Sequence, residues 1–140
     1  GGLIRTCQRL HYLAAGRATR PAESWDIMGD WADEGHGLLS LAYDYKDRPL
    51  EMSDWPPCVD FSYFIIDGNW AYYASAASLR PNIHHAVIWT ALLGLKGLGV
   101  QTAEMGWRGE AKDEKGKSIE FFKTGFPGED APVFVAERRF

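Results

Sequence analysis

Hydrophobic positions recur every three or four residues in the first part of the chain. The spacing predicts an amphipathic helix over residues 3–15 that ends at Gly16, with an apolar stripe of Leu3, Cys7, Leu10 and Ala14. A second helix is predicted from Pro21, whose missing N–H costs nothing in a first turn, to Gly35. Its buried stripe consists of Trp25, Met28 and Ala32. Two helices therefore precede the first predicted strand.

After Gly35 the pattern changes to an alternation of apolar and polar positions. It predicts a strand over residues 39–45 and two longer strands over residues 59–66 and 70–77. The two longer strands are separated by Asp67-Gly68-Asn69, which is a strong hairpin signal. The small residues that end the second of them, Ala74 to Ser78, allow a ligand or the next helix to approach closely.

The clearest helical stripe covers residues 82–98, and Asn82 is the expected N-cap. It is followed by a predicted strand over residues 100–107, a charged loop over residues 108–117, a short helix capped by Ser118 and a final strand over residues 133–137. This order of elements predicts an α/β or α+β sandwich, with helices on both faces of a mixed sheet.

Composition narrows the class of protein. A length of 140 residues predicts a single domain, residues 1–140, and a net charge of -4 with a pI of about 5.5 gives no sign of nucleic-acid binding by bulk electrostatics. Cys7 and Cys58 lack the spacing of a zinc site or a disulfide scaffold, so no metal is expected. The longest apolar run, residues 86–95, is shorter than the roughly 18 residues of a membrane span. We therefore expect a soluble, cytoplasmic protein.

Several charged residues stand where a ligand could bind. The start of the helix over residues 82–98 is suited to an anion, with Arg80, His84 and His85 beside it, although the favoured role for one of the two histidines is a cap or a core residue. Arg17 and Arg20 either hold a phosphate or carboxylate or are surface charges paired with nearby acids or carbonyls.

Glu104 and Lys123 are the candidates for chemistry. Glu104 lies near the end of a predicted strand, where it is either a general base for an amine or a carboxylate that ties down the next loop. Lys123 stands among phenylalanines, where it either stabilises developing negative charge, holds a phosphate, or extends to water.

The segment that contains Lys123 resembles a known family. Ile119, Phe122, Lys123, Gly125 and Phe126 match the I-x-x-F-K-x-G-F motif near the C-terminus of the FemAB-like branch of the GNAT superfamily. The stretch Ala15 to Pro21 followed by Trp25, and the triplet Glu104-Met105-Gly106, are also similar to segments of that group. The resemblance implies a GNAT-like, mostly antiparallel twisted sheet with helices on both faces that lacks the usual first strand. It corresponds to the C-terminal domain of two-domain relatives.

The resemblance implies an acyl or aminoacyl transferase that acts on a small-molecule or peptide amine. Acetyl-CoA-dependent relatives have a glycine-containing loop where this chain has residues 80–85 without glycine, which favours an aminoacyl-tRNA donor over acyl-CoA. Glu104 and Lys123 are then catalytic. The expected donor or phosphate ligands are Arg80, Asn82, His84, His85 and Phe122, and the expected groove residues are Tyr72, Tyr73 and Trp107.

Two alternatives remain open from the sequence. One is a non-catalytic binding module that keeps the fold and completes its groove by homodimerisation. The other is a fragment of a longer two-domain enzyme.

Overall fold

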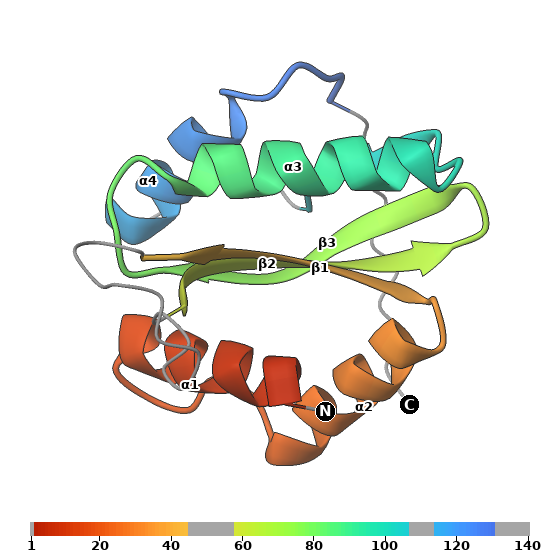
Figure 1. Ribbon diagram of the computed structural model, residues 1–140. Coiled ribbons are helices and arrows are strands. Elements are labelled where there is room, and N and C mark those ends of the chain that lie inside the picture. The colour runs from red at the N-terminus through yellow and green to blue at the C-terminus, as the bar shows by residue number, and fades with distance from the viewer. Residues whose placement is uncertain (1, 45–57, 107–113, 131–140) are drawn as a thin grey trace, which may run out of the picture. The chain divides into compact units, whose positions relative to one another are not determined.

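The computed structural model describes residues 2–44, 58–106 and 114–130. The chain forms two compact units, residues 1–106 and 107–140, and each is described by itself. In the first unit a sheet is covered by helix α3 on one face and by helices α1 and α2 on the other (Figure 1). The prediction of a single domain stays a prediction.

The two N-terminal helices form as the hydrophobic spacing predicts. Helix α1 spans Gly2–Ala15 and ends at Gly16, whose φ of 70° lies in the left-handed region that glycine adopts without strain. Helix α2 spans Ala22–Asp33, with Pro21 at its N-cap position. The helices approach closely at Gly29, where a Cβ atom would lie 3.1 Å from the Ile4 side chain.

Four described strands form one sheet in the order β1-β2-β3-β4. Strands β1 (Gly37–Tyr43), β2 (Cys58–Asp67) and β3 (Trp70–Ser78) pair antiparallel, and the short strand β4 (Thr102–Glu104) pairs parallel to β3. The predicted hairpin between β2 and β3 is confirmed, and Gly68 in its turn has a φ of 58°. The parallel pairing requires a crossover, which is supplied by helix α3 (His84–Gly97).

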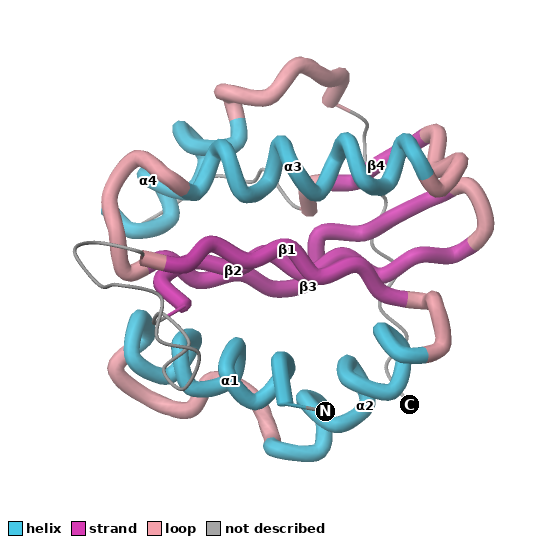
Figure 2. The backbone as a smooth tube through the Cα atoms, viewed as in Figure 1, coloured by secondary structure: helices cyan, strands magenta, loops and turns pink. Residues whose placement is uncertain are grey.

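Helices lie on both sides of the sheet (Figure 2), and because side chains alternate along a strand, the core has two layers. Phe61 and Tyr63 point to the layer under α1 and α2, where they pack in one cluster with Ile4, Cys7, Leu10, Trp25 and Met28. The other layer contains the buried α3 residues Val87, Ile88, Ala91 and Leu95. Leu38 of β1 lies against α3 at Gly94, where a Cβ atom would be 3.3 Å from it. The sheet is therefore buried on both faces.

Strand β1 begins at Gly37, two residues before its predicted start, and three further boundaries differ from the sequence prediction. Asn82 is not the N-cap of α3, because the helix begins at His84 after Ile83, and Asn82 adopts a left-handed φ of 68°. The predicted strand over residues 100–107 is shorter in the structure, since the Val100 N–H donates to the Leu95 carbonyl and so closes the end of α3. Val100 therefore belongs to the helix end rather than to the strand.

The third difference concerns helix α4, which spans Glu114–Lys123. Ser118 lies inside this helix and does not cap it, and residues 114–117 are helical although they were assigned to a loop. The Lys117 ammonium donates to Glu114 over 3.1 Å, and such a pair three residues apart supports a helix on the surface. The predicted strand over residues 133–137, Trp107 and residues 108–113 lie outside the described residues. None of the described helices is long and apolar enough to cross a membrane.

Candidate functional site

Strands β3 and β4 separate shortly after they meet. Their parallel pairing covers only Trp70 to Tyr72 on β3 and Thr102 to Glu104 on β4. Strand β3 then continues to Ser78, a further span of about 20 Å at the rise of a strand. Along that span one edge of β3 pairs with β2, while the opposite edge has no strand partner among the described residues. Within the part of the chain that the structure describes, this is an open edge, along which backbone N–H and C=O groups are presented.

A β-bulge lies within this open part of β3. Tyr73 pairs with Phe64 and Ser75 with Tyr63, so Ala74 is the extra residue. A bulge bends its strand and increases the local twist, which helps β3 to diverge from a neighbour. The Ala74 carbonyl accepts a hydrogen bond of 3.3 Å from the Arg20 guanidinium.

Arg20 is a residue whose structural role the sequence did not reveal. Its side chain is half-buried, lies over the Trp25 ring at 5.3 Å and contacts the Met28 sulfur at 3.4 Å. The sequence offered a phosphate ligand or a paired surface charge as its role. The structure shows instead a cation held against an aromatic ring and a strand carbonyl, and only the tertiary fold brings the Ala74 carbonyl to it.

Glu104 and Tyr72 lie beside one another where β3 and β4 part. They are partners in the parallel ladder, so their side chains share one face of the sheet. Glu104 is half-buried and Tyr72 is 44% exposed. Tyr73 follows on β3 and points to the opposite face, toward α3. The predicted groove residues Tyr72 and Tyr73 therefore line different faces, and Trp107 lies outside the described residues.

The N-terminus of α3 lies at the end of the open edge of β3. Asn82 is in the left-handed region and Ile83 has φ -100° and ψ -20°, a succession that turns backbone N–H groups toward a common point. The Ala86 and Val87 N–H groups donate to the Ile83 carbonyl, and Ile83, at the N-cap position, makes no side-chain capping hydrogen bond. Arg80, in the preceding loop, forms an ion pair with Asp44 and is about half exposed. This end of α3 has the properties of an anion site.

A buried polar network joins α3 to the sheet. The Asp60 carboxylate, 0% exposed, accepts a hydrogen bond of 2.7 Å from Nδ1 of His84, and Nε2 of His84 lies 2.9 Å from the Tyr73 hydroxyl. Burial, and then the charge of Asp60, raises the pKa of Tyr73, so the phenol keeps its proton and donates it to Nε2. The His84 side chain is therefore held between two strands. His85, the next residue, is exposed.

The second unit contains Lys123 and Phe122, in the motif that carries the family resemblance. Lys123 is the last residue of α4, and the Phe122 ring packs edge-on against Phe126 with centroids 5.5 Å apart. The N–H of Phe126 donates to the Lys123 carbonyl, which closes the helix end. The catalytic role of Lys123 and the donor-binding role of Phe122 stay predictions.

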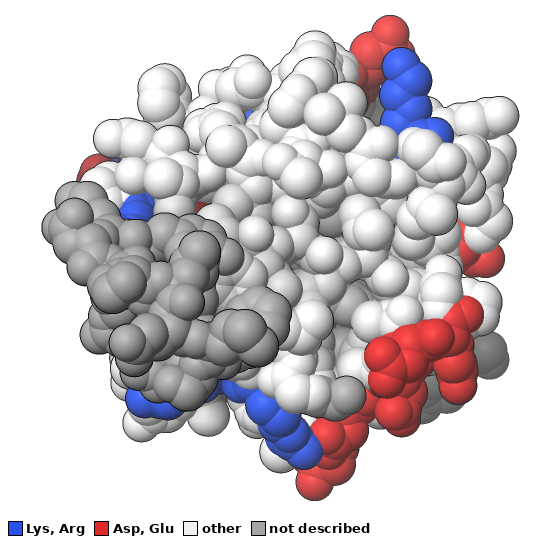
Figure 3. Space-filling model, viewed as in Figure 1, with Lys and Arg blue, Asp and Glu red and all other residues white. Residues whose placement is uncertain are grey.

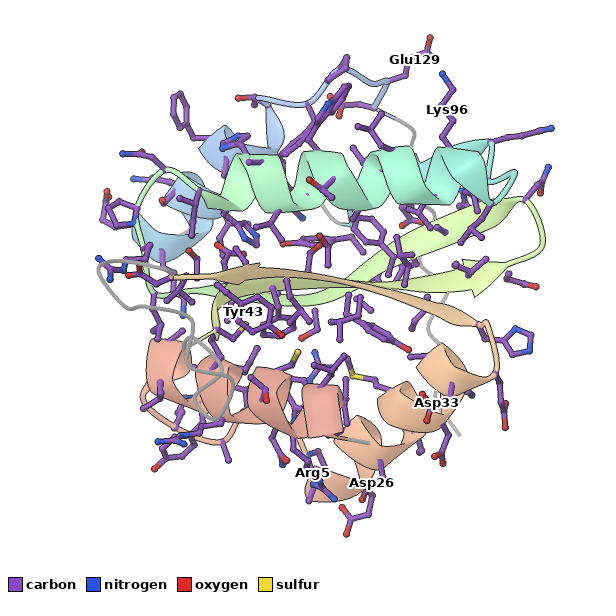
Figure 4. The ribbon with its side chains drawn as sticks, in the orientation of Figure 1. Arg5, Asp26, Asp33, Tyr43, Lys96 and Glu129 are labelled. Carbon is purple, nitrogen blue, oxygen red and sulfur yellow. The ribbon has the colours of Figure 1, made fainter. Side chains whose placement is uncertain are left out.

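Two hollows lie elsewhere on the first unit. One has a volume of about 540 Å³ and lies between the end of α3 and β4, lined by Leu92, Leu95, Lys96, Gly99, Val100, Gln101, Thr102 and Ala103. The other, of about 410 Å³, lies between α1 and α2, where Arg5 and Asp26 point toward one another at 2.5 Å (Figure 4). Acidic side chains gather over α2 beside it (Figure 3). No group of three metal-ligating side chains occurs among the described residues.

Comparison with known proteins shows the fold. No protein-family model matches the sequence, and no curated protein sequence matches it. The solved structure of a "Putative acetyltransferase from Agrobacterium tumefaciens str. C58" superposes with a TM-score of 0.61 at 12% identity, over 97% of this chain and 94% of that one. A second, the "Crystal structure of a probable acetyltransferase", gives a TM-score of 0.52 at 9% identity, over 97% and 91% of the two chains. The predicted GNAT-like α+β fold is confirmed. Membership of the FemAB-like branch stays a prediction.

Proposed function

We propose that this chain is an acyltransferase that moves an acyl group from a phosphate-bearing thioester donor, such as acetyl-CoA, to an amine. The observation that carries the proposal is the open edge of β3 beyond Tyr72, which runs from Glu104 toward the N-terminus of α3. The similarity in fold to two proteins named as acetyltransferases supports the same class of reaction.

The open edge fits an extended donor. An extended ligand can add to a free strand edge through main-chain hydrogen bonds. The span of about 20 Å between Tyr72 and Ser78 accommodates the arm that separates the thioester from the phosphates of such a donor. The phosphates would then reach the first turn of α3. The left-handed turn there is made by Asn82, so the absence of glycine from residues 80–85 no longer favours aminoacyl-tRNA over acyl-CoA.

The proposed chemistry uses Glu104 and the backbone of β3. The Glu104 carboxylate takes a proton from the ammonium of the acceptor, and the neutral amine nitrogen attacks the thioester carbonyl carbon. A free N–H on the open edge of β3 stabilises the oxyanion of the tetrahedral intermediate. The attack forms the carbon–nitrogen bond, and collapse re-forms the carbonyl and breaks the carbon–sulfur bond. The departing thiolate takes a proton from the nitrogen, and Glu104 releases its proton to water. The acceptor enters on the face that Tyr72 and Glu104 share.

A thiol-release assay with acetyl-CoA and a panel of primary amines tests the proposal. Glu104→Gln keeps the shape of the side chain and removes the base, so it should lower kcat by about 10²–10⁴-fold. Asp67→Asn is the matched control, because Asp67 is an exposed carboxylate at the end of β2, in the hairpin and outside the proposed site, and its loss should leave turnover unchanged. Equal turnover by Glu104→Gln and the wild type would exclude Glu104 as the general base. Binding of acetyl-CoA without turnover of any amine would favour a non-catalytic binding module.

A further inference from the structure

We propose that Arg20 is a positioning residue that holds the β-bulge of β3 and thereby fixes the open edge where the donor binds. The inference rests on the proposed function only for its kinetic consequence. Its structural part concerns the contact between the Arg20 guanidinium, which comes from the turn between α1 and α2, and the Ala74 carbonyl at the bulge.

The residues around Arg20 favour the contact between its guanidinium and the Ala74 carbonyl. The guanidinium is always charged and has no acceptor atoms, so a half-buried position requires partners that accept hydrogen bonds or face the cation. Trp25, only 2% exposed, supplies its ring face at 5.3 Å, and the Ala74 carbonyl accepts at 3.3 Å. Because Trp25 is fixed in the core, the carbonyl of the bulge is held at a defined place. A straight β3 would leave the charge without that acceptor.

The bulge is anchored from the other face as well. Tyr73, which precedes Ala74, points toward α3 and bonds His84 through its hydroxyl. Two consecutive residues of β3 are thus held from opposite sides of the sheet, one by its side chain and one by its carbonyl. A shift of one residue would turn every later side chain of β3 to the wrong face. The bulge therefore decides which N–H and C=O groups between Tyr73 and Ser78 reach the open edge.

Loss of the Arg20 side chain should loosen β3 only at the bulge. In Arg20→Ala, we expect hydrogen exchange of the Ser75 and Ala77 amides, which face β2, to become about tenfold faster, as the loss of a charge-assisted hydrogen bond would give. Amides of β1 that face β2, such as that of Ser40, should keep their wild-type rates. Arg17→Ala is the matched control, because Arg17 is an exposed arginine in the same turn and its loss should change neither strand.

The kinetic consequence is a selective effect on the donor. In Arg20→Ala, the KM for acetyl-CoA should rise about tenfold while kcat changes less than threefold, because the binding edge is displaced and Glu104 is untouched. Arg20→Lys keeps a cation that can donate to the carbonyl but loses the planar stacking on Trp25, so it should restore part of the KM. A general loss of stability would not raise KM while leaving kcat nearly unchanged.

Hydrogen exchange, measured by NMR on the full chain, separates the two proposals. If the wild type neither binds nor turns over acetyl-CoA, the proposed function fails, and the exchange of the Ser75 and Ala77 amides still decides the role of Arg20. Unchanged exchange at these amides in Arg20→Ala would overturn the inference. Equal acceleration in β1 and β3 would also overturn it, because that result indicates general destabilisation. Faster exchange confined to β3 with an unchanged KM would overturn the kinetic part.

Discussion

Replacement of His84 by alanine should be among the most destabilising single changes at the buried network. Nδ1 of His84 donates to the Asp60 carboxylate, which is 0% exposed and whose second oxygen, Oδ2, has no partner among the described residues. His84→Ala would leave both carboxylate oxygens buried without a donor. A buried polar group left without its hydrogen-bond partner costs about 1–3 kcal/mol, and more when the group is charged. We expect about 3 kcal/mol, because the 18% exposure of the His84 side chain gives water a path to the vacated space.

The reverse change should cost less. Asp60→Ala removes the buried carboxylate itself and leaves His84, which can reach water and still bond the Tyr73 hydroxyl. The double variant Asp60→Ala/His84→Ala should be more stable than the sum of the two single changes predicts, because the second change no longer strands a charge. A positive coupling of at least 1 kcal/mol follows from this reasoning.

Urea unfolding, followed by tryptophan fluorescence and circular dichroism, measures all of these variants. His85→Ala is the matched control, since His85 is the exposed neighbour in the same turn and its loss should change the free energy of unfolding by less than about 0.5 kcal/mol. Effects of His84→Ala and His85→Ala of equal size would refute the assignment of a buried pair. Strict additivity in the double variant would do so too.

Three further predictions concern backbone geometry and titration. Asn82→Gly should keep the KM for acetyl-CoA in the thiol-release assay, whereas Asn82→Ala should lower stability to urea by about 1–2 kcal/mol, because alanine is strained at a φ of 68°. Gly37→Ala should reduce the melting temperature measured by circular dichroism, because its Cβ would meet the Tyr63 hydroxyl, which donates to the Met28 carbonyl. Burial raises the pKa of Tyr63 to about 12. The free energy of unfolding should therefore fall between about pH 10 and 12, because the phenol ionises at a lower pH in the unfolded chain. Tyr63→Phe should weaken that fall in urea titrations at each pH.

Local sequence patterns predicted much of the fold. Helix α1 follows from the three-and-four spacing of its apolar residues and ends at Gly16, and the hairpin between β2 and β3 follows from Asp67-Gly68-Asn69. These signals act over a few residues, so they can be read from the chain. The start of α3 was misplaced because Asn82 is favoured both as an N-cap and in the left-handed conformation, and the structure uses the second property.

The candidate site depends on contacts that local patterns do not encode. Nothing near Ala74 in the sequence marks a bulge, because the bulge is defined by the pairing with β2. Arg20 and Ala74 are brought together only when α2 packs on the sheet. Likewise, the sequence shows Asp60 only as a polar residue within an apolar strand. Its partner His84 comes from α3, and the tertiary fold brings the two together. Glu104 was identified from its place at a strand end, and the structure confirms that position.

Backbone NMR of the labelled protein during titration with acetyl-CoA tests the central claim most directly. Saturable shifts of the amides from Tyr73 to Ser78 and from Ile83 to His85, with the hairpin at Gly68 unchanged, are the predicted result. Shifts confined to the hollow between α1 and α2, or no shift at millimolar acetyl-CoA, would contradict the donor site on the open edge of β3.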